Sequence, residues 1–405
     1  MNNVADFTNN FASLTSKMNL CAQKRPLVQL TLNIINTYQV VSKRTVDDVV
    51  QQPIIDEAGY VILPMHYKIY EYEVVRLIAK GDTATLYQVQ HNNTFYCLKV
   101  SRQQQKFQQA IENEISLIQL VWRHSKMVAP KFINSFSIQQ SRCFISEYCE
   151  LNLLQLIEMT SNQGLQLQYT RLLALQLVHY LQVMSKLNMT HGDLVPSNIL
   201  MNSSSPSEVR LVDFSNGSLE NRFEFGHTHL WFRAPEQLYL QPQTQKVDVF
   251  ALACTLFFCH TGKPLFPAQG ELQLAKMHFQ LLDVQQKEML KHQDQNRLFF
   301  QRFDDQFWKQ NFTQLQKIGS QEIDSVLPTA EVLQQNSVYD KIVRETGFRG
   351  KKLLRQLVVN VAFMGKEGHR EEDYDQFCDM LWEMLEFDDT QRVGWKEVAE
   401  CRFLK

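Results

Sequence analysis

Apolar and polar residues alternate most clearly along a stretch that begins near residue 70. The alternation predicts a strand at residues 71–78, a short break at 79–82 and a second strand at 83–90. Two asparagines at 92–93 have turn chemistry, and a third strand is predicted at 94–100. We therefore expect an antiparallel three-stranded meander.

Helical periodicity follows the meander and dominates the rest of the chain. A first helix is predicted from Gln104 onward, because apolar side chains return on one of its faces. These positions are Phe107, Ile111, Ile118 and Val121. Strand-like stretches recur at 132–138 and 142–148, and most of the chain after residue 151 is helical, for example 170–187. The pattern predicts an α+β chain with a small β-rich lobe followed by a large α-rich lobe.

The composition excludes several classes of protein. The chain has 405 residues, 44% of them hydrophobic, and a formal net charge of −2. This is enough apolar material for a buried core, and the near-zero charge argues against a dedicated nucleic-acid binder. The longest apolar run, 249–259, is too short to span a bilayer, and the N-terminus lacks the features of a secretory signal. Eight single cysteines predict reduced thiols and an intracellular protein, cytoplasmic or nuclear.

Two charged residues fall at positions where the pattern predicts burial. Lys99 lies near the end of the strand at 94–100, where alternation turns its side chain away from water. Glu114 lies within the apolar stripe of the following helix, whereas Glu112 is about 100° away from it. Because buried charges need partners, we predict that Lys99 and Glu114 form an ion pair. The alternative is an ordinary lysine that reaches solvent and a glutamate at the edge of the stripe.

Three further polar residues suggest an oxygen-rich site. Asp193 and Asn198 are five residues apart, with a proline between them and apolar residues on both sides. Asp213 follows a short apolar strand that begins at Val209. Carboxylate and amide oxygens of this kind suit Mg²⁺, so Asn198 and Asp213 are candidate ligands. Asp193 would then be free to accept a proton from a hydroxyl group.

In this order along the chain, the five polar residues resemble those of the protein kinases, whose fold has two lobes. The resemblance implies that Lys99 holds the α- and β-phosphates of ATP, with Glu114 as its helix partner. It also implies that Asp193 is the catalytic base, while Asn198 and Asp213 bind Mg²⁺.

Other positions match the same family. Residues 234–236 read Ala-Pro-Glu, which resembles the motif that closes the kinase activation segment. Asp248 is similar to the aspartate that braces the catalytic loop, and Arg392 to the arginine that pairs with the glutamate of that motif. The hinge that binds adenine would fall at Glu147 and Cys149.

Several stretches narrow the resemblance to the CMGC group and to the dual-specificity tyrosine-regulated kinase (DYRK) family. Residues 230–236 and 262–267 are similar to CMGC kinases, and residues 56–74 are similar to the segment that leads into the DYRK kinase domain. We therefore expect a bilobal kinase domain at 56–405 after an N-terminal extension at 1–55. Within it, the N-lobe would span about 70–149, the C-lobe about 150–405 and a CMGC-type insert about 268–370.

The nucleotide-binding and catalytic segments depart from the family pattern. The phosphate loop keeps one of three glycines, Gly81, and has Ala79 in the place of the first, so its hold on phosphate should be looser. Val195 replaces the lysine of the catalytic loop, and Gly192 replaces the arginine of the H-R-D motif.

The activation segment departs most. No tyrosine lies between Asp213 and Glu236, and Gly226 stands where the second tyrosine of the family would be. Leu230 replaces an arginine expected to bind the phosphate on that tyrosine, while Arg233 remains. These losses agree with one another, because a segment without a phosphorylated tyrosine has no phosphate to bind.

The resemblance implies an ATP- and Mg²⁺-dependent kinase that phosphorylates serine or threonine in protein substrates. The rival hypothesis is a pseudokinase that acts as a scaffold, which the missing lysine and glycines favour. We expect a monomer that binds neither nucleic acid nor membrane. An aromatic stripe at 299–308 is more typical of an insert helix packed on the large lobe, although docking of a partner through the insert stays open.

Overall fold

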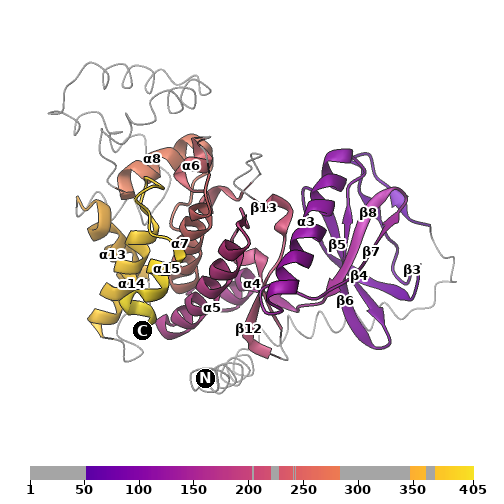
Figure 1. Cartoon of the computed structure of the whole chain (residues 1–405), viewed down its shortest axis with the longest axis horizontal. Helices are drawn as coiled ribbons and strands as arrows, with labels where there is room; N and C mark the ends of the chain where they lie inside the picture. The colour runs from indigo at the N-terminus through magenta and orange to yellow at the C-terminus, as the bar shows by residue number, and fades with distance from the viewer. Residues whose placement is uncertain are drawn as a thin grey trace, which may run out of the picture. The chain divides into compact units, whose positions relative to one another are not determined.

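The structure is a computed structural model that describes residues 52–202, 205–219, 228–239, 241, 243–282, 347–361 and 370–405. The chain divides into two compact units. The first unit comprises Met1–Trp122, Ala129–Leu151 and Leu200–Arg210. The second unit comprises Arg123–Val128, Asn152–Ile199 and Leu211–Lys405. The expected α+β architecture is confirmed, because the first unit is rich in strands and the second is mostly helical (Figure 1).

The first unit is built on a six-stranded antiparallel sheet with the strand order β3-β4-β5-β6-β8-β7 (Figure 1). The strands are β3 (Lys68–Ile69), β4 (Tyr72–Lys80), β5 (Ala84–His91), β6 (Thr94–Ser101), β7 (Phe132–Ile138) and β8 (Ser141–Glu147). The predicted meander is confirmed as β4, β5 and β6. The predicted break at 79–82 is too long, because Lys80 pairs with Thr85 and therefore still belongs to β4.

The two faces of this sheet are used differently. Apolar side chains of one face form the core, with Val74, Tyr87, Val89, Leu98, Val100 and Ile145 at its centre. Side chains alternate along β6, so Lys99 points away from this core. Helix α3 (Gln105–His124) supplies the partner for that side chain, and its predicted apolar stripe is buried at Ile111, Ile118 and Val121.

The segment that leads into the sheet is folded against it. Strand β1 (Ile54–Ile55) pairs with β2 (Val61–Ile62). The hydroxyl of Tyr87 donates to the carbonyl oxygen of Val61 at 3.0 Å and accepts from the backbone N–H of Leu63 at 3.1 Å. Ordered contacts therefore begin before residue 56, the boundary predicted for the kinase domain. Of the predicted extension, residues 1–51 lie outside the described residues.

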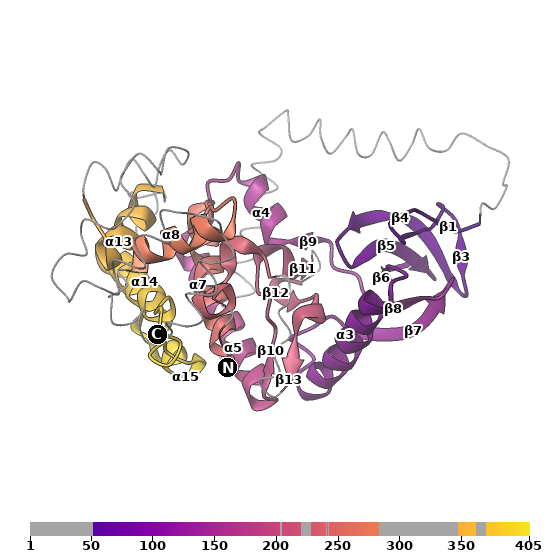
Figure 2. The same ribbon diagram turned by 90° about the horizontal axis from the view of Figure 1, so that it is seen from above.

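The second unit is assembled around helix α7 (Lys246–Thr261). Every residue of α7 except Lys246 is buried, which is why its sequence is apolar on all sides. Helices α5 (Leu167–Lys186), α13 (Gly350–Val361) and α14 (Glu371–Met384) pack against it (Figures 1 and 2). The unit also contains α4 (Leu153–Met159), α6 (Pro235–Leu238), α8 (Glu271–Leu282) and α15 (Trp395–Glu400).

A buried ion pair joins two distant parts of the second unit. The guanidinium of Arg392 donates to both carboxylate oxygens of Glu236, at 2.6 and 2.8 Å, and both side chains are almost fully buried. Arg392 also donates to the backbone carbonyls of Lys246 and Glu386, at 3.0 and 2.8 Å. The pairing predicted for the Ala-Pro-Glu motif is thus confirmed, and it fixes the end of the activation segment to the start of α7.

Short strands connect the larger elements. β9 (Leu151–Asn152), β11 (Ile199–Asn202) and β12 (Ser205–Leu211) form a sheet in the order β12-β11-β9, and β10 (Met189–Thr190) pairs with β13 (Ser218–Leu219). Within the described ranges, no helix combines the length and apolar character needed to cross a bilayer. The predicted aromatic stripe at 299–308 lies outside the described residues, as do 283–346 and 362–369 of the predicted insert.

Candidate active site

The buried lysine and glutamate of the first unit form an ion pair, as predicted. The Nζ atom of Lys99 lies 2.7 Å from Oε2 of Glu114, and their side chains are 9% and 2% exposed. Glu112, which the periodicity placed away from the stripe, contacts Arg142 instead. The sheet and α3 therefore present one fixed ammonium group, and its role toward phosphate stays a prediction.

The pairing of the strands places Ala79 in the same row as this lysine. Ala79 pairs with Leu86, Leu86 with Lys99, and Lys99 with Phe144, so the four residues form one line across the sheet. Side chains directly opposite each other in a sheet point to the same face. Ala79 therefore lies on the same face of the sheet as Lys99. This is the face on which a residue that contacts the nucleotide is expected.

Gly81 is held in a tight hairpin. Its N–H donates to the carbonyl oxygen of Ala84, and its own carbonyl accepts from the Tyr60 hydroxyl, both at 2.9 Å. A Cβ at this position would meet only the Ala84 oxygen, at 3.6 Å, which is an ordinary contact. The N–H of Gly81 is thus used by the hairpin, and the expectation of a looser phosphate cradle gains a structural reason.

The lead-in segment ties down the same hairpin. Lys80 forms an ion pair with Asp56 at 2.8 Å, and its ammonium lies 3.9 Å from the centre of the Tyr60 ring. Arg102 donates to the carbonyl oxygens of Ala58 and Asp82. These contacts connect both ends of the predicted phosphate loop to residues 56–60, which resemble the DYRK lead-in.

The predicted hinge follows β8. Glu147 ends this strand opposite Tyr96, and its backbone N–H donates to the carbonyl of Lys131 at 2.9 Å. Burial raises the pKa of the Cys149 thiol to about 12, so the thiol is protonated at neutral pH. Between them, the hydroxyl of Tyr148 accepts from Arg76 at 2.9 Å. The structure leaves the adenine-binding roles of Glu147 and Cys149 as predictions.

In the second unit, Asp193 and Asn198 are joined directly. The side-chain amide of Asn198 donates to the backbone carbonyl and to Oδ2 of Asp193, both at 3.0 Å. The 3₁₀ turn η1 (Pro196–Asn198) bends the chain so that the two side chains meet. Because the amide nitrogen faces Asp193, the carbonyl oxygen of Asn198 is the atom left for a cation.

Asp248 of α7 holds the loop that carries Asp193 through hydrogen bonds to the loop's backbone. Its two carboxylate oxygens accept from the backbone N–H groups of His191 and Gly192, at 2.7 and 2.9 Å. Burial raises the pKa of Asp248 to about 6, and the two N–H donors act in the opposite direction. The predicted bracing role of Asp248 is confirmed.

His191 connects this loop to the strand before Asp213. Its Nε2 donates to the carbonyl of Val212 at 3.1 Å, and its Nδ1 accepts from the N–H of Asp193 at 3.3 Å. Its ring packs against Phe214, with ring centres 4.7 Å apart. With Nε2 donating and Nδ1 accepting, the ring ties together the backbone beside Asp193 and beside Asp213.

Gly192 occupies a position that only glycine fits. Its φ is +77°, and a Cβ built there would lie 2.6 Å from the backbone oxygen of Asn216. That oxygen belongs to the 3₁₀ turn η2 (Phe214–Asn216), directly after Asp213. The glycine that stands in the place of the H-R-D arginine is therefore coupled to the backbone turn directly after Asp213.

Asp213 and Asp193 lie close enough to interact electrostatically. The N–H of Val212 donates to the carbonyl of Asn198 at 3.0 Å, and the Ser215 hydroxyl donates to Oδ1 of Asp213 at 2.7 Å. Burial raises the pKa of Asp193 to about 6, and the negative charge of Asp213 contributes in the same direction. Two carboxylates and an amide oxygen form a donor set that suits a hard divalent cation.

The end of the activation segment touches the candidate base. The backbone N–H of His229 donates to Oδ1 of Asp193 at 3.0 Å, and this contact lowers the carboxyl pKa. The His229 ring accepts from the N–H of Trp231 at 3.3 Å and packs against the Trp231 and Phe232 rings. No sequence motif pointed to this role of His229.

Arg233 is already bound to an anion and to backbone. It forms an ion pair with Glu271 of α8 at 2.7 Å. It also donates to the hydroxyl and the carbonyl of Thr228, at 3.1 and 2.8 Å. Gly226, which marks the position of the missing tyrosine, lies outside the described residues. The guanidinium of Arg233 is thus already paired with a carboxylate of the chain itself, that of Glu271.

Comparisons with known proteins agree with this geometry. The family profile of the protein kinase domain matches residues 72–404. The chain is similar to a putative dual specificity tyrosine-phosphorylation-regulated kinase 3 homolog of Drosophila melanogaster, with 25% identity over 251 residues, or 60% of this chain and 30% of that protein. Dual specificity tyrosine-phosphorylation-regulated kinase 3 of Macaca fascicularis and of Homo sapiens match with the same identity, over 44% and 42% of their lengths. The match therefore spans less than half the length of these curated relatives.

Proposed function

Because the chain belongs to the protein kinase family, we propose that it is an active, DYRK-like kinase that transfers the γ-phosphate of ATP to serine or threonine hydroxyls of proteins. The observation that carries the proposal is the preserved set of five polar residues. Lys99 and Glu114 form a buried pair, and Asp193 and Asn198 are joined beside Asp213. A scaffold that never used nucleotide would have no need for either arrangement.

Each of these residues has a defined part in the proposed reaction. Asp193 accepts the proton of the attacking hydroxyl, and its N–H contact from His229 keeps one carboxylate oxygen oriented. Asn198 and Asp213 would hold Mg²⁺, which neutralises charge on the phosphates when it is bound. Lys99 supplies a fixed positive charge for the phosphates, and Glu114 keeps that ammonium in place.

The finer parts of the proposal follow the resemblance. Arg233 would favour proline after the phosphorylated residue. The seven described cysteines form no disulfides, which supports an intracellular location, cytoplasmic or nuclear. We also propose that the chain acts as a monomer on protein substrates, and that a partner docks through the insert at 268–370. Phosphoryl transfer from ATP to a generic protein substrate, with and without Mg²⁺, is the direct test of the central claim.

Lys99→Met is expected to abolish the rise in melting temperature that Mg·ATP gives the parent chain. A ligand present at 100 times its Kd stabilises a folded protein by about 2.7 kcal/mol, which a thermal melt resolves easily. Methionine keeps the apolar stem of lysine but removes the charge that would contact phosphate. The measurement is a melting curve with and without millimolar Mg·ATP.

Two further variants separate nucleotide contact from folding. Lys99→Met leaves Glu114 buried without its cation, so the double variant Lys99→Met/Glu114→Gln should melt closer to the parent while still lacking the shift. Lys68→Met changes an exposed lysine of β3 and should keep the full shift. An undiminished shift in both Lys99 variants would show that Lys99 does not contact the nucleotide.

Activity is expected to be independent of tyrosine phosphorylation. The segment between Asp213 and Glu236 has no tyrosine, and Arg233 is already paired with Glu271. Protein made in bacteria and then treated with a tyrosine phosphatase should keep its parental rate, with loss of phosphotyrosine checked by mass spectrometry. A large drop in rate would show that a tyrosine elsewhere in the chain controls the enzyme.

A further inference from the structure

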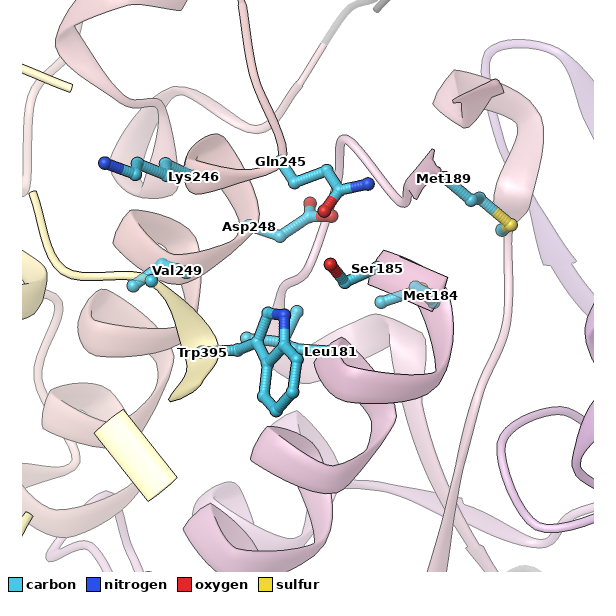
Figure 3. A pocket seen from close by; sticks show the side chains of 10 residues that line it. Leu181, Met184, Ser185, Met189, Gln245, Lys246, Asp248, Val249 and Trp395 are labelled. Carbon is cyan, nitrogen blue, oxygen red and sulfur yellow. The ribbon is translucent and has the colours of Figure 1, made fainter. Parts of the chain in front are cut away.

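A cavity of about 210 Å³ lies within the second unit, where the end of α5, strand β10 and the first turns of α7 and α15 meet (Figure 3). All of its lining residues belong to this unit. Asp248 lines this cavity, and its carboxylate also accepts hydrogen bonds from the backbone N–H groups of His191 and Gly192. None of the five polar residues of the candidate active site lines it.

Polar groups converge on this cavity without partners among the described residues. Figure 3 shows the Gln245 amide, the Ser185 hydroxyl and the indole nitrogen of Trp395 turned toward the space beside the Asp248 carboxylate. Within the described part of the chain, the side chains of Gln245, Ser185 and Trp395 make no hydrogen bond. The Lys246 amine points away and donates to the backbone carbonyl of Asp389 at 2.9 Å.

The Asp248 carboxylate faces the cavity, and no cation of the described residues acts on it. It is 1% exposed, and its two hydrogen bonds come from backbone N–H groups. Each carboxylate oxygen has a second lone pair and can accept another donor. A hydrogen bond from a ligand N–H to this buried carboxylate would be stronger than the same bond to an exposed carboxylate.

The remaining walls are apolar. Leu181, Met184 and Met189 are at most 5% exposed, and the Trp395 ring closes one side. An apolar cavity of about 150 Å³ is large enough to bind benzene. The space here therefore accommodates one six-membered ring with a small polar substituent.

We propose that this cavity binds a compact aromatic carboxamide. The ring lies against Leu181, Met184 and Met189, the amide N–H donates to Asp248, and the amide oxygen accepts from Trp395 or Gln245. An anion is excluded, because it would face the Asp248 carboxylate without a donor to offer. The ligand would contact the group that holds residues 191–192, so the cavity is also placed to influence the loop of Asp193. The inference does not depend on the proposed kinase activity.

The probe is benzamide, added to the full chain labelled with ¹³C at the methionine methyl groups. We expect saturable shifts of the Met184 and Met189 signals, with a Kd on the order of 1 mM, which is typical of a ligand this small. Met384, which is buried in α14 of the same unit, should not shift. Benzoate, which has the same shape but no N–H, should bind at least about tenfold more weakly.

Two variants locate the binding. Ser185→Phe fills the cavity from a half-buried position and should weaken benzamide binding at least about tenfold, in a protein that melts like the parent. Trp395→Phe keeps an aromatic wall without the N–H, and should weaken binding severalfold even if the first variant does not fold. Equal binding of benzoate and benzamide, or shifts that bypass Met184 and Met189, would overturn the proposal.

Discussion

Asp193→Asn is expected to reduce the kcat of phosphoryl transfer by about 10²- to 10⁴-fold, the range that a positioned general base contributes. An amide has the shape of a carboxylate but cannot accept the proton of the attacking hydroxyl. The lost interaction belongs to the transition state more than to the ground state, so the KM for ATP should hardly change. Single-turnover transfer and a thermal melt with Mg·ATP measure the two effects separately.

The surroundings of Asp193 make this substitution a clean one. The new amide oxygen can still accept from the N–H of His229, while its nitrogen would face the donating amide of Asn198. One hydrogen bond is lost, which costs about 1 kcal/mol of folding free energy. Asp375→Asn alters an exposed carboxylate of α14 and should leave the rate unchanged. A variant at Asp193 that kept more than a tenth of the parental rate would exclude this residue as the base.

Arg392→Met is expected to destabilise the fold by about 3–5 kcal/mol, the cost of removing one partner of a buried ion pair. Glu236 would remain buried without a cation, and the backbone carbonyls of Lys246, Glu386 and Phe387 would lose this donor. The measurement is urea-induced unfolding followed by circular dichroism. The expected change is a lower midpoint with an unchanged slope.

An exposed pair of the same unit serves as the control. Lys351 and Asp379 lie 2.7 Å apart, but their side chains are 50% and 58% exposed. Lys351→Met should therefore change the stability by less than about 1 kcal/mol. If both variants cost the same small amount, the Arg392–Glu236 pair would not be what fixes the activation segment to α7.

The sequence was sufficient to predict those elements whose periodicity is strong over their whole length. Strands β4 to β8 begin and end within about two residues of their predicted bounds, and helix α3 begins one residue after its predicted start, because alternation and the apolar stripe mark these elements locally. The extension of β4 through Lys80 was missed, because it depends on pairing with Thr85 rather than on the residues of β4 themselves. The fold of residues 53–62 was also not predicted, since its contacts are with Tyr87 and Gln139, far along the chain.

The same distinction applies to the candidate site. The pairing of Lys99 with Glu114 could be predicted, because each charge fell on a face where burial demands a partner. The contact between the His229 backbone and Asp193 could not, because any residue can supply a backbone N–H. The pairing of Arg233 with Glu271 was missed for another reason: nothing in the pattern of α8 marks Glu271 as facing an arginine.

Gly192 also bears on how readily an arginine could return to the H-R-D position during evolution. A single substitution would place a Cβ 2.6 Å from the Asn216 oxygen, at a backbone angle that side chains rarely adopt. The backbone of such a variant would thus be strained, whether or not the new guanidinium formed an ion pair. Reversal requires the turn after Asp213 to change first or at the same time. An arginine placed at position 192 alone is therefore expected to destabilise the fold, unless the turn at residues 214–216 changes with it.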